Sequence, residues 1–203
     1  MDTSNRPYLR VWTPGTYVLH STGGPSERVE VQSVNRPLEM TGAWQVSFAQ
    51  DWGAPDHATF EKLISWTDSK DDGIKYFSGR VVYRKEFNMP QSDLNENAYV
   101  ELDLGVVHKV ARVHLNGREV AVLWKPPFCV DITDAVKPGQ NELTVEVANT
   151  WTNRLIGDAT LPPEKQYCQT NLHGRLSRKD RRLQPSGLLG PVTIHTATHV
   201  YAN

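Results

Sequence analysis

Apolar and polar residues alternate with a period of two along much of the chain. Such alternation places successive side chains on opposite faces of an extended strand, so one face can pack into a core while the other meets water. The alternating segments are 28–34, 44–48, 80–87, 100–104, 111–115 and 143–147. The pattern therefore predicts many short β-strands, each buried on one face.

Turn residues separate these segments. Asn116-Gly117 follows one alternating run directly, and both residue types tolerate a positive φ, so residues 119–123 are expected to return antiparallel to 111–115. Residues 137–141 form a second predicted turn. The 13 Pro and 14 Gly of the chain suit an all-β fold with many such turns.

Helical patterns are scarce. Residues 59–63 are expected to form one short helix, and residues 134–136 a single turn. Because no long amphipathic helices separate the strands, doubly wound α/β and TIM-barrel folds are excluded. The predicted fold class is all-β, a jelly-roll β-sandwich of two sheets with a short N-terminal strand appendage.

A domain boundary is expected near residues 34–38. Residues 1–36 contain strand-like runs separated by a Gly-Gly-Pro break, which predicts an N-terminal strand pair or a linker from a preceding domain. Residues 37–203 are expected to form the jelly-roll domain. Within it, 150–190 is expected to be mostly irregular, and stretches of that length usually carry function or dock onto another surface.

Charge and composition exclude several partners. The formal net charge is −1, which is not the electrostatic signature of a nucleic-acid-binding protein. No segment reaches the roughly 20 apolar residues of a membrane span, and the first residues show no signal-peptide pattern. One basic run is expected to be a solvated loop, or else a contact for an anion or acidic sugar: Arg175, Arg178, Lys179, Arg181 and Arg182.

Catalysis by this chain alone is not expected. A glycosidase needs two carboxyl groups at a set separation, one protonated and one ionised, and no sequence motif of an activated nucleophile occurs. Five acids follow one another in the predicted loops around Trp52 and Trp66: Asp51, Asp56, Asp68, Asp71 and Asp72. They are expected to be solvated turn residues, although a structural calcium ion would suit such oxygen ligands. No other cofactor is predicted.

Sugar binding is the chemistry that the loop residues suit best. A sugar offers C–H patches that stack on aromatic rings and hydroxyls that hydrogen-bond to planar polar side chains. The first candidate group is Trp151, Asn153, Arg154 and Asp158, which follows a predicted strand. In the alternative interpretation, Trp151 plugs the end of the sandwich while Arg154 and Asp158 pair internally.

Two further candidate groups contain tryptophan. Trp124 and Lys125 precede Pro126-Pro127, so the prolines either present the indole ring on a rigid platform or pack against it. Trp52 and Trp66 lie among the acidic loop residues, and their alternative role is in the core or against a neighbouring domain. Cys129 lies in a strand pattern and is expected to be a buried, inert thiol.

Several runs of sequence together indicate a family. Residues 83–87, 100–105, 111–117, 127–133, 137–143 and 145–149 resemble the sugar-binding jelly-roll domain of family 2-type glycoside hydrolases, a galactose-binding-like fold. The runs Leu-Trp-Lys-Pro-Pro-Phe at 123–128, Asn-Arg-Leu-Ile-Gly-Asp at 153–158 and Pro-Ser-Gly-Leu-Leu-Gly-Pro-Val at 185–192 are more similar to the C-terminal region of family 106 α-L-rhamnosidases.

The resemblance implies a non-catalytic, carbohydrate-binding domain of a secreted or periplasmic glycoside hydrolase. The implied ligand is a plant or algal polysaccharide, either rhamnose-containing or acidic. The related enzymes keep their catalytic acid and base on a separate barrel, so the implied partner is a covalently linked catalytic domain. Neither a nucleic acid nor a membrane is an expected partner. Two alternatives remain: a structural jelly roll that packs against the barrel without binding sugar, and a small glycoside-active enzyme.

Overall fold

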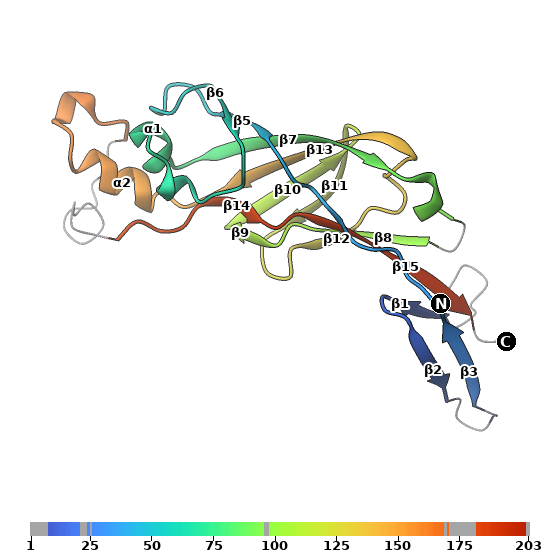
Figure 1. Cartoon of the computed structure of the whole chain (residues 1–203). Helices are drawn as coiled ribbons and strands as arrows, with labels where there is room; N and C mark the ends of the chain where they lie inside the picture. Colours follow the sequence, from blue (N-terminus) through green and yellow to red (C-terminus); the bar gives the residue numbers. More distant parts are fainter. Residues whose placement is uncertain are drawn as a thin grey trace.

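A computed structural model describes residues 8–20, 24, 26–95, 98–168, 170 and 182–201. Strands dominate this part of the chain (Figure 1). They are β1 (Tyr8–Val11), β2 (Gly15–Leu19), β3 (Glu27–Val31), β4 (Leu38–Glu39), β5 (Trp44–Phe48), β6 (His57–Phe60), β7 (Arg80–Met89), β8 (Ala98–Asp103), β9 (Val106–His108), β10 (Val110–Leu115), β11 (Arg118–Leu123), β12 (Cys129–Asp131), β13 (Gly139–Ala148), β14 (Gly187–Gly190) and β15 (Thr193–Tyr201). The helices α1 (Asp72–Lys75) and α2 (Thr152–Asp158), and 3-10 turns at Trp66–Asp68, Gln91–Asp93 and Pro163–Lys165, complete the described elements.

The strands form two main sheets that enclose one core. One sheet has the order β11-β10-β13-β7-β5-β6, and the other has the order β1-β15-β8-β12 with β4 added beside β15. The named strands pair antiparallel throughout the described residues. Side chains from both sheets meet in the core, among them Val81, Val113 and Val145 from the first and Leu102 and Ile194 from the second. The all-β jelly-roll sandwich predicted from the alternation is confirmed.

The alternating pattern gives each strand its buried face. In β13, Leu143, Val145 and Val147 are fully buried, while the residues between them are only partly covered. β13 pairs with β7 over ten residues of each strand, so the two strands form the central ladder of the larger sheet. This burial of one apolar face per strand supplies the main driving force for closing the sandwich.

The predicted hairpin lies where the sequence places it. Asn116 has a φ of 53° and Gly117 a φ of 80°, and β10 and β11 pair on either side of them. A two-residue turn with both φ values positive matches the right-handed twist of its strands, which is why Asn-Gly favours it.

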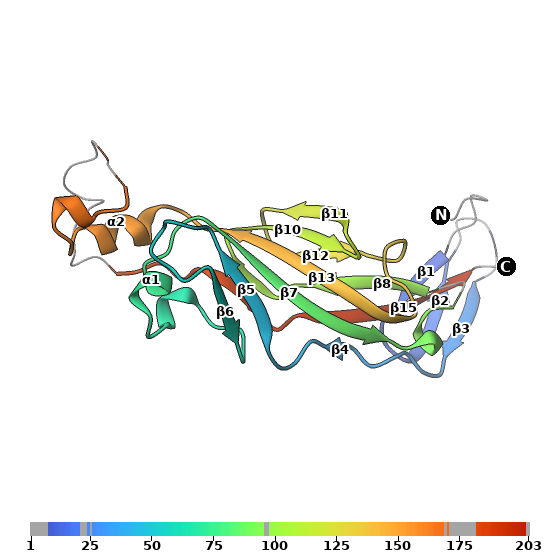
Figure 2. The same cartoon turned by 90° about the horizontal axis from the view of Figure 1, so that it is seen from above.

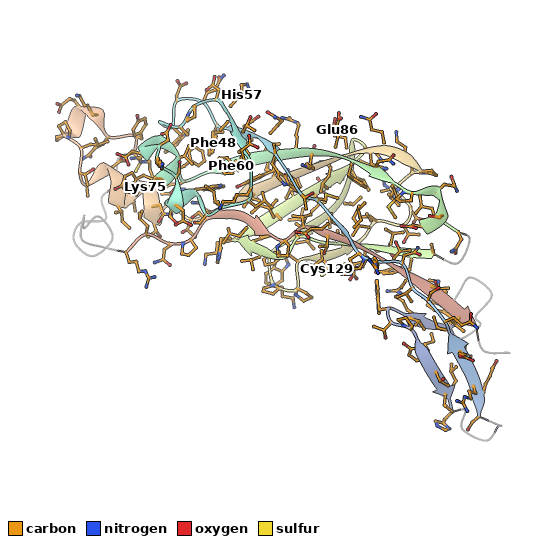
Figure 3. The ribbon with its side chains drawn as sticks, viewed as in Figure 1. Phe48, His57, Phe60, Lys75, Glu86 and Cys129 are labelled. Atoms are coloured by element: carbon orange, nitrogen blue, oxygen red, sulfur yellow. The ribbon has the colours of Figure 1, made fainter. Side chains whose placement is uncertain are left out.

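Two predictions about helices differ from the structure. The helix expected at 59–63 is wrong, because His57–Phe60 forms β6 and pairs with β5, which supplies the backbone hydrogen bonds that a helix would have made internally. Phe60 thereby reaches the core beside Phe48, with ring centroids 6.5 Å apart (Figure 3). Conversely, the stretch expected to be irregular after residue 150 contains the helix α2.

The N-terminal residues join the sandwich through one strand. β1 pairs with β15, while β2 and β3 pair only with each other and project from the end of the sandwich opposite α2 (Figure 2). The boundary expected between residues 36 and 37 stays a prediction, and β1 lies on the N-terminal side of it. None of the described helices has the length and apolar character needed to cross a membrane.

Tyr83 is a polar hub inside the core. Its hydroxyl accepts a hydrogen bond from Trp66 Nε1 at 2.5 Å and another from the Leu188 backbone N–H at 3.3 Å. All three residues are completely buried, and burial raises the pKa of the Tyr83 hydroxyl to about 12. The hydroxyl therefore joins the Trp66 loop and β14 to the larger sheet.

We predict that Tyr83→Phe lowers the free energy of unfolding by about 1–3 kcal/mol, because two buried donors lose their acceptor. Urea denaturation measures the change. Tyr17→Phe is the matched control, since that hydroxyl contacts only Thr13 on the exposed hairpin, and it should stay within about 0.5 kcal/mol of the wild type. Equal stability of the two variants would show that the hydrogen bonds of the Tyr83 hydroxyl do not stabilise the fold.

Cys129 lies on the outer face of the smaller sheet (Figure 3), opposite Asp103 of β8, and is half-buried rather than fully buried. Partial burial raises the pKa of its thiol to about 11, and the neighbouring Asp103 and Glu101 carboxylates add to the rise. The thiolate is the reactive form, so a raised pKa makes the group less reactive at neutral pH.

We predict that iodoacetamide alkylates Cys129 at pH 7.5 at least roughly twentyfold more slowly than it alkylates a cysteine in an unstructured peptide. The thiolate fraction falls by about 300-fold relative to a thiol with a pKa near 8.5, and the greater nucleophilicity of a more basic thiolate restores only about tenfold. Peptide mapping by mass spectrometry measures the rate at which Cys129 is alkylated. The rate should rise about tenfold per pH unit toward pH 11, and a plateau below pH 10 would contradict the assignment.

Candidate carbohydrate-contacting site

The strand register brings two of the predicted tryptophans to one end of the larger sheet. In β10, Ala111 pairs with Leu123 of β11 on one side and with Val147 of β13 on the other. β11 and β13 therefore run in the same direction and end at the same edge, on the side of the molecule that carries α2 (Figure 2). Trp124 directly follows β11, and Trp151 follows β13 after two residues.

Both of these indole rings face solvent. Trp124 is 70% exposed and Trp151 is 69% exposed, so neither packs into the sandwich. Lys125 Nζ lies 5.5 Å from the centroid of the Trp124 ring, within range of a cation–π contact. Trp151 precedes the first turn of α2 and makes no capping hydrogen bond through its side chain. We call Trp124, Lys125 and Trp151 the loop end.

The polar residues of the first predicted group lie beneath this surface. Asn153 is buried, and its side chain donates to the Gln184 carbonyl and to Ser186 Oγ, and accepts from the Gln184 N–H. All of its hydrogen-bonding groups thus hold the 184–186 segment. Asn153 is therefore removed from the candidate sugar-contacting residues, because no free group remains to meet a ligand.

Arg154 and Asp158 form a buried ion pair across one turn of α2. Arg154 Nε lies 2.9 Å from Asp158 Oδ1, and both side chains are about 95% covered. Asp158 Oδ2 accepts from the backbone N–H and the thiol of Cys168. Burial raises the pKa of that thiol to about 11, with the hydrogen bond to Asp158 adding to the rise. The Asp158 carboxylate is therefore occupied by partners within the protein. This agrees with the alternative interpretation, in which Arg154 and Asp158 pair internally.

The remaining two candidate tryptophans, Trp66 and Trp52, have different environments in the structure. Trp66 is fully buried, with its Nε1 bonded to Tyr83 and its ring edge-on to Phe77 at 5.7 Å. A ring enclosed on both faces cannot stack on a sugar, so Trp66 is corrected to a core residue. Trp52 is 37% exposed, in the loop between β5 and β6.

The acidic loop residues serve local roles. Asp71 caps α1 by accepting from the Gly73 and Ile74 N–H groups, and Asp56 accepts from the Gln50 amide. Across the parts of the chain that the structure describes, no three His, Cys, Asp or Glu side chains gather closely enough to hold a metal ion. The basic run at 175–182 lies outside the described residues except for Arg182, which is exposed.

Sequence reasoning missed the residues that shape the inner part of this region. The ring of Tyr167 lies under the Arg154 guanidinium, 4.6 Å from its central carbon. Ser186 receives hydrogen bonds from both Asn149 and Asn153. An aromatic residue in a proline-rich loop was a usable signal for Tyr167, whereas nothing local to Ser186 indicates its partners.

Comparisons with known proteins agree with this architecture. A family model described as "Glycosyl hydrolase 2 galactose-binding domain-like" matches residues 66–183. A protein of Formosa agariphila named "Putative beta-glucuronidase" is 38% identical over 90% of this chain, which corresponds to 18% of that protein.

Solved structures give the same result. The rhamnosidase from Novosphingobium sp. PP1Y superposes with a TM-score of 0.73 at 38% identity, covering 82% of this chain and 16% of that one. A β-glucuronidase from an uncultured Clostridium sp. superposes with a TM-score of 0.58 at 22% identity, covering 83% of this chain and 30% of that one, and it supports the fold alone.

The chain thus spans less than a third of each of these relatives. The family match covers more than half of its length and includes β7 through β13 and α2. This chain belongs to the glycosyl hydrolase 2 galactose-binding domain-like family.

Proposed function

We propose that this chain is a non-catalytic accessory domain of a larger, secreted or periplasmic glycoside hydrolase, and that its loop end contacts a polysaccharide. The observation that carries the proposal is the pair of tryptophans, each about 70% exposed, that follow β11 and β13, the two strands on either side of β10. The ligand class is a plant or algal polysaccharide, with rhamnose-containing and acidic chains as the first to test.

The chemistry of the loop end supports sugar contact. An indole presents a broad apolar face that complements the C–H side of a pyranose, and its N–H can reach a hydroxyl. Lys125 adds a mobile donor beside the Trp124 ring. Neither ring is committed to the core, so most of each indole is open to a ligand.

The distribution of acids supports a non-catalytic role. Hydrolysis of a glycosidic bond needs two carboxyl groups facing the same substrate. Among the described residues, Asp158 is the buried acid, and its partner is the Arg154 guanidinium rather than a second carboxylate. The relatives whose names refer to hydrolysis are several times longer than this chain, which leaves room in them for a separate catalytic domain.

A second candidate function is structural. The same two tryptophans would suit an interface with a neighbouring domain, and the short span of this chain within its relatives favours that possibility. The two functions make different predictions for the isolated chain, because only a sugar-contacting surface binds free polysaccharide.

We predict that affinity electrophoresis through gels containing rhamnose-rich, pectic or other anionic polysaccharides retards the isolated chain in at least one case. Trp124→Ala and Trp151→Ala should each weaken binding about tenfold, which corresponds to about 1.4 kcal/mol, because each removes a stacking surface. The measured quantity is the dissociation constant obtained from mobility against polysaccharide concentration.

Trp12→Ala is the matched control, since Trp12 is half-exposed, follows β1 and contacts Tyr99 and His195 away from the loop end. It should leave the dissociation constant unchanged. Absence of retardation on every polysaccharide would favour the structural role. Retardation that both loop-end variants retain would place the binding surface elsewhere.

A further inference from the structure

A small cavity lies between α1, α2 and the turn that contains Gly53. Its volume is about 170 Å³, and Asp72, Tyr76, Arg154, Thr160 and Tyr167 contribute side chains to its wall. Pockets for drug-sized ligands span about 300–1,000 Å³, so this cavity suits one small unit rather than a chain of several.

The Arg154 guanidinium brings uncommitted donors to this cavity. The side chain is 96% covered, and its Nε faces Asp158. Within the described residues its Nη1 and Nη2 groups donate no hydrogen bond, although Arg carries four N–H bonds on those two atoms. Both nitrogens keep some contact with solvent, so a ligand hydroxyl can replace water as their acceptor.

The backbone of α2 lets the guanidinium occupy the cavity wall. A Cβ on Gly157 would lie 2.6 Å from Arg154 Nη2 and 2.7 Å from the Tyr76 side chain. Any larger residue would displace one of these two groups. Because glycine occupies position 157, the guanidinium can lie against the helix and beside Tyr76, where it lines the cavity.

The other wall groups complement a polyol. Tyr76 and Tyr167 supply aromatic surface, and Arg154 supplies donors. The exposed Asp72 carboxylate can accept from hydroxyls, and Thr160 Oγ1, which donates to the Gly157 carbonyl, keeps its lone pairs free to accept. Donors, acceptors and rings around a space of this size are the requirements of a single sugar residue.

The charges near the cavity favour a neutral ligand. Arg154 is compensated by Asp158, and the Asp72 carboxylate is accompanied by Lys75, whose Nζ lies 5.6 Å from the Tyr76 ring centroid. These four described charges sum to zero. A carboxylate on the ligand would meet Asp72 without an excess positive charge to offset it.

We propose that this cavity binds one neutral sugar residue through the free edge of Arg154, the Asp72 carboxylate and the Tyr76 and Tyr167 rings. The proposal deepens the proposed function, on which it rests, by naming a second contact and its ligand class. The cavity and the loop end are distinct surfaces, so one can bind sugar while the other does not.

Titration followed by ¹H–¹⁵N correlation spectra separates the two surfaces. Gly53, Gly73 and Gly157 line the cavity, so their amide signals report on it, while the indole N–H signals of Trp124 and Trp151 report on the loop end. The probes are the methyl glycosides of rhamnose, galactose, mannose, xylose and glucose, each to 50 mM. Methyl β-D-glucuronide is compared with methyl β-D-glucoside, because the two differ only in oxidation at C6.

We predict that at least one neutral glycoside shifts the three glycine amides saturably. Asp72→Asn and Tyr167→Ala alter exposed side chains, so the fold should persist, and each should weaken the effect at least fivefold. Asp68→Asn, in the same region but outside the cavity wall, should leave it unchanged.

Three outcomes would overturn the proposal: unmoved glycine amides with every neutral glycoside, movement with the glucuronide alone, or shifts that survive both variants. If the indole signals move while the glycine signals do not, sugar binding in the cavity is rejected and the proposed function stands. If the glycine signals move but no polysaccharide retards the chain, the proposal for the loop end is rejected and the proposal for the cavity stands.

Discussion

A network of side-chain-to-backbone hydrogen bonds holds the α2 end of the sandwich in place of a strand ladder. Asn149 leaves β13, donates to the Phe77 carbonyl and to Ser186 Oγ, and accepts from the Gly79 N–H. Asn153 makes a reciprocal pair of bonds with the Gln184 backbone, and Ser186 donates its N–H to Ser65. Buried backbone groups need such partners, so these few polar residues substitute for regular structure over four separate segments.

The network decides which side chains of α2 meet solvent. With Asn149 and Asn153 fixed, Trp151 is left on the outside, while Arg154 points inward to Asp158 and Tyr167. The exposure of Trp151 and the small cavity are therefore two consequences of one arrangement. A buried ion pair contributes little net stability, because removing both charges from water costs about as much as their attraction returns.

The sequence predicted the elements whose pattern is local. Alternation located the strands, and Asn116-Gly117 located a turn, because a period of two and a positive φ depend only on neighbouring residues. Trp66 and Trp124 could not be told apart, because both lie in loop-like sequence. Residues distant in sequence hold Trp66 in the core through the Tyr83 hydroxyl and the rings of Phe48 and Phe77. Likewise α2 is seven residues long without a side-chain cap, so its stability comes from tertiary contacts that no local pattern encodes.

The functional account depends on an α2 end that is rigid before any ligand arrives. Native-state hydrogen exchange of the Gln184 amide tests this most directly, because that N–H lies in a surface loop and its acceptor is Asn153 Oδ1, 2.8 Å away. The account predicts exchange slowed at least about 1,000-fold relative to an unstructured chain, an opening free energy of about 4 kcal/mol or more. Exchange near the unstructured rate, while the Val145 amide in β13 remains protected, would contradict it.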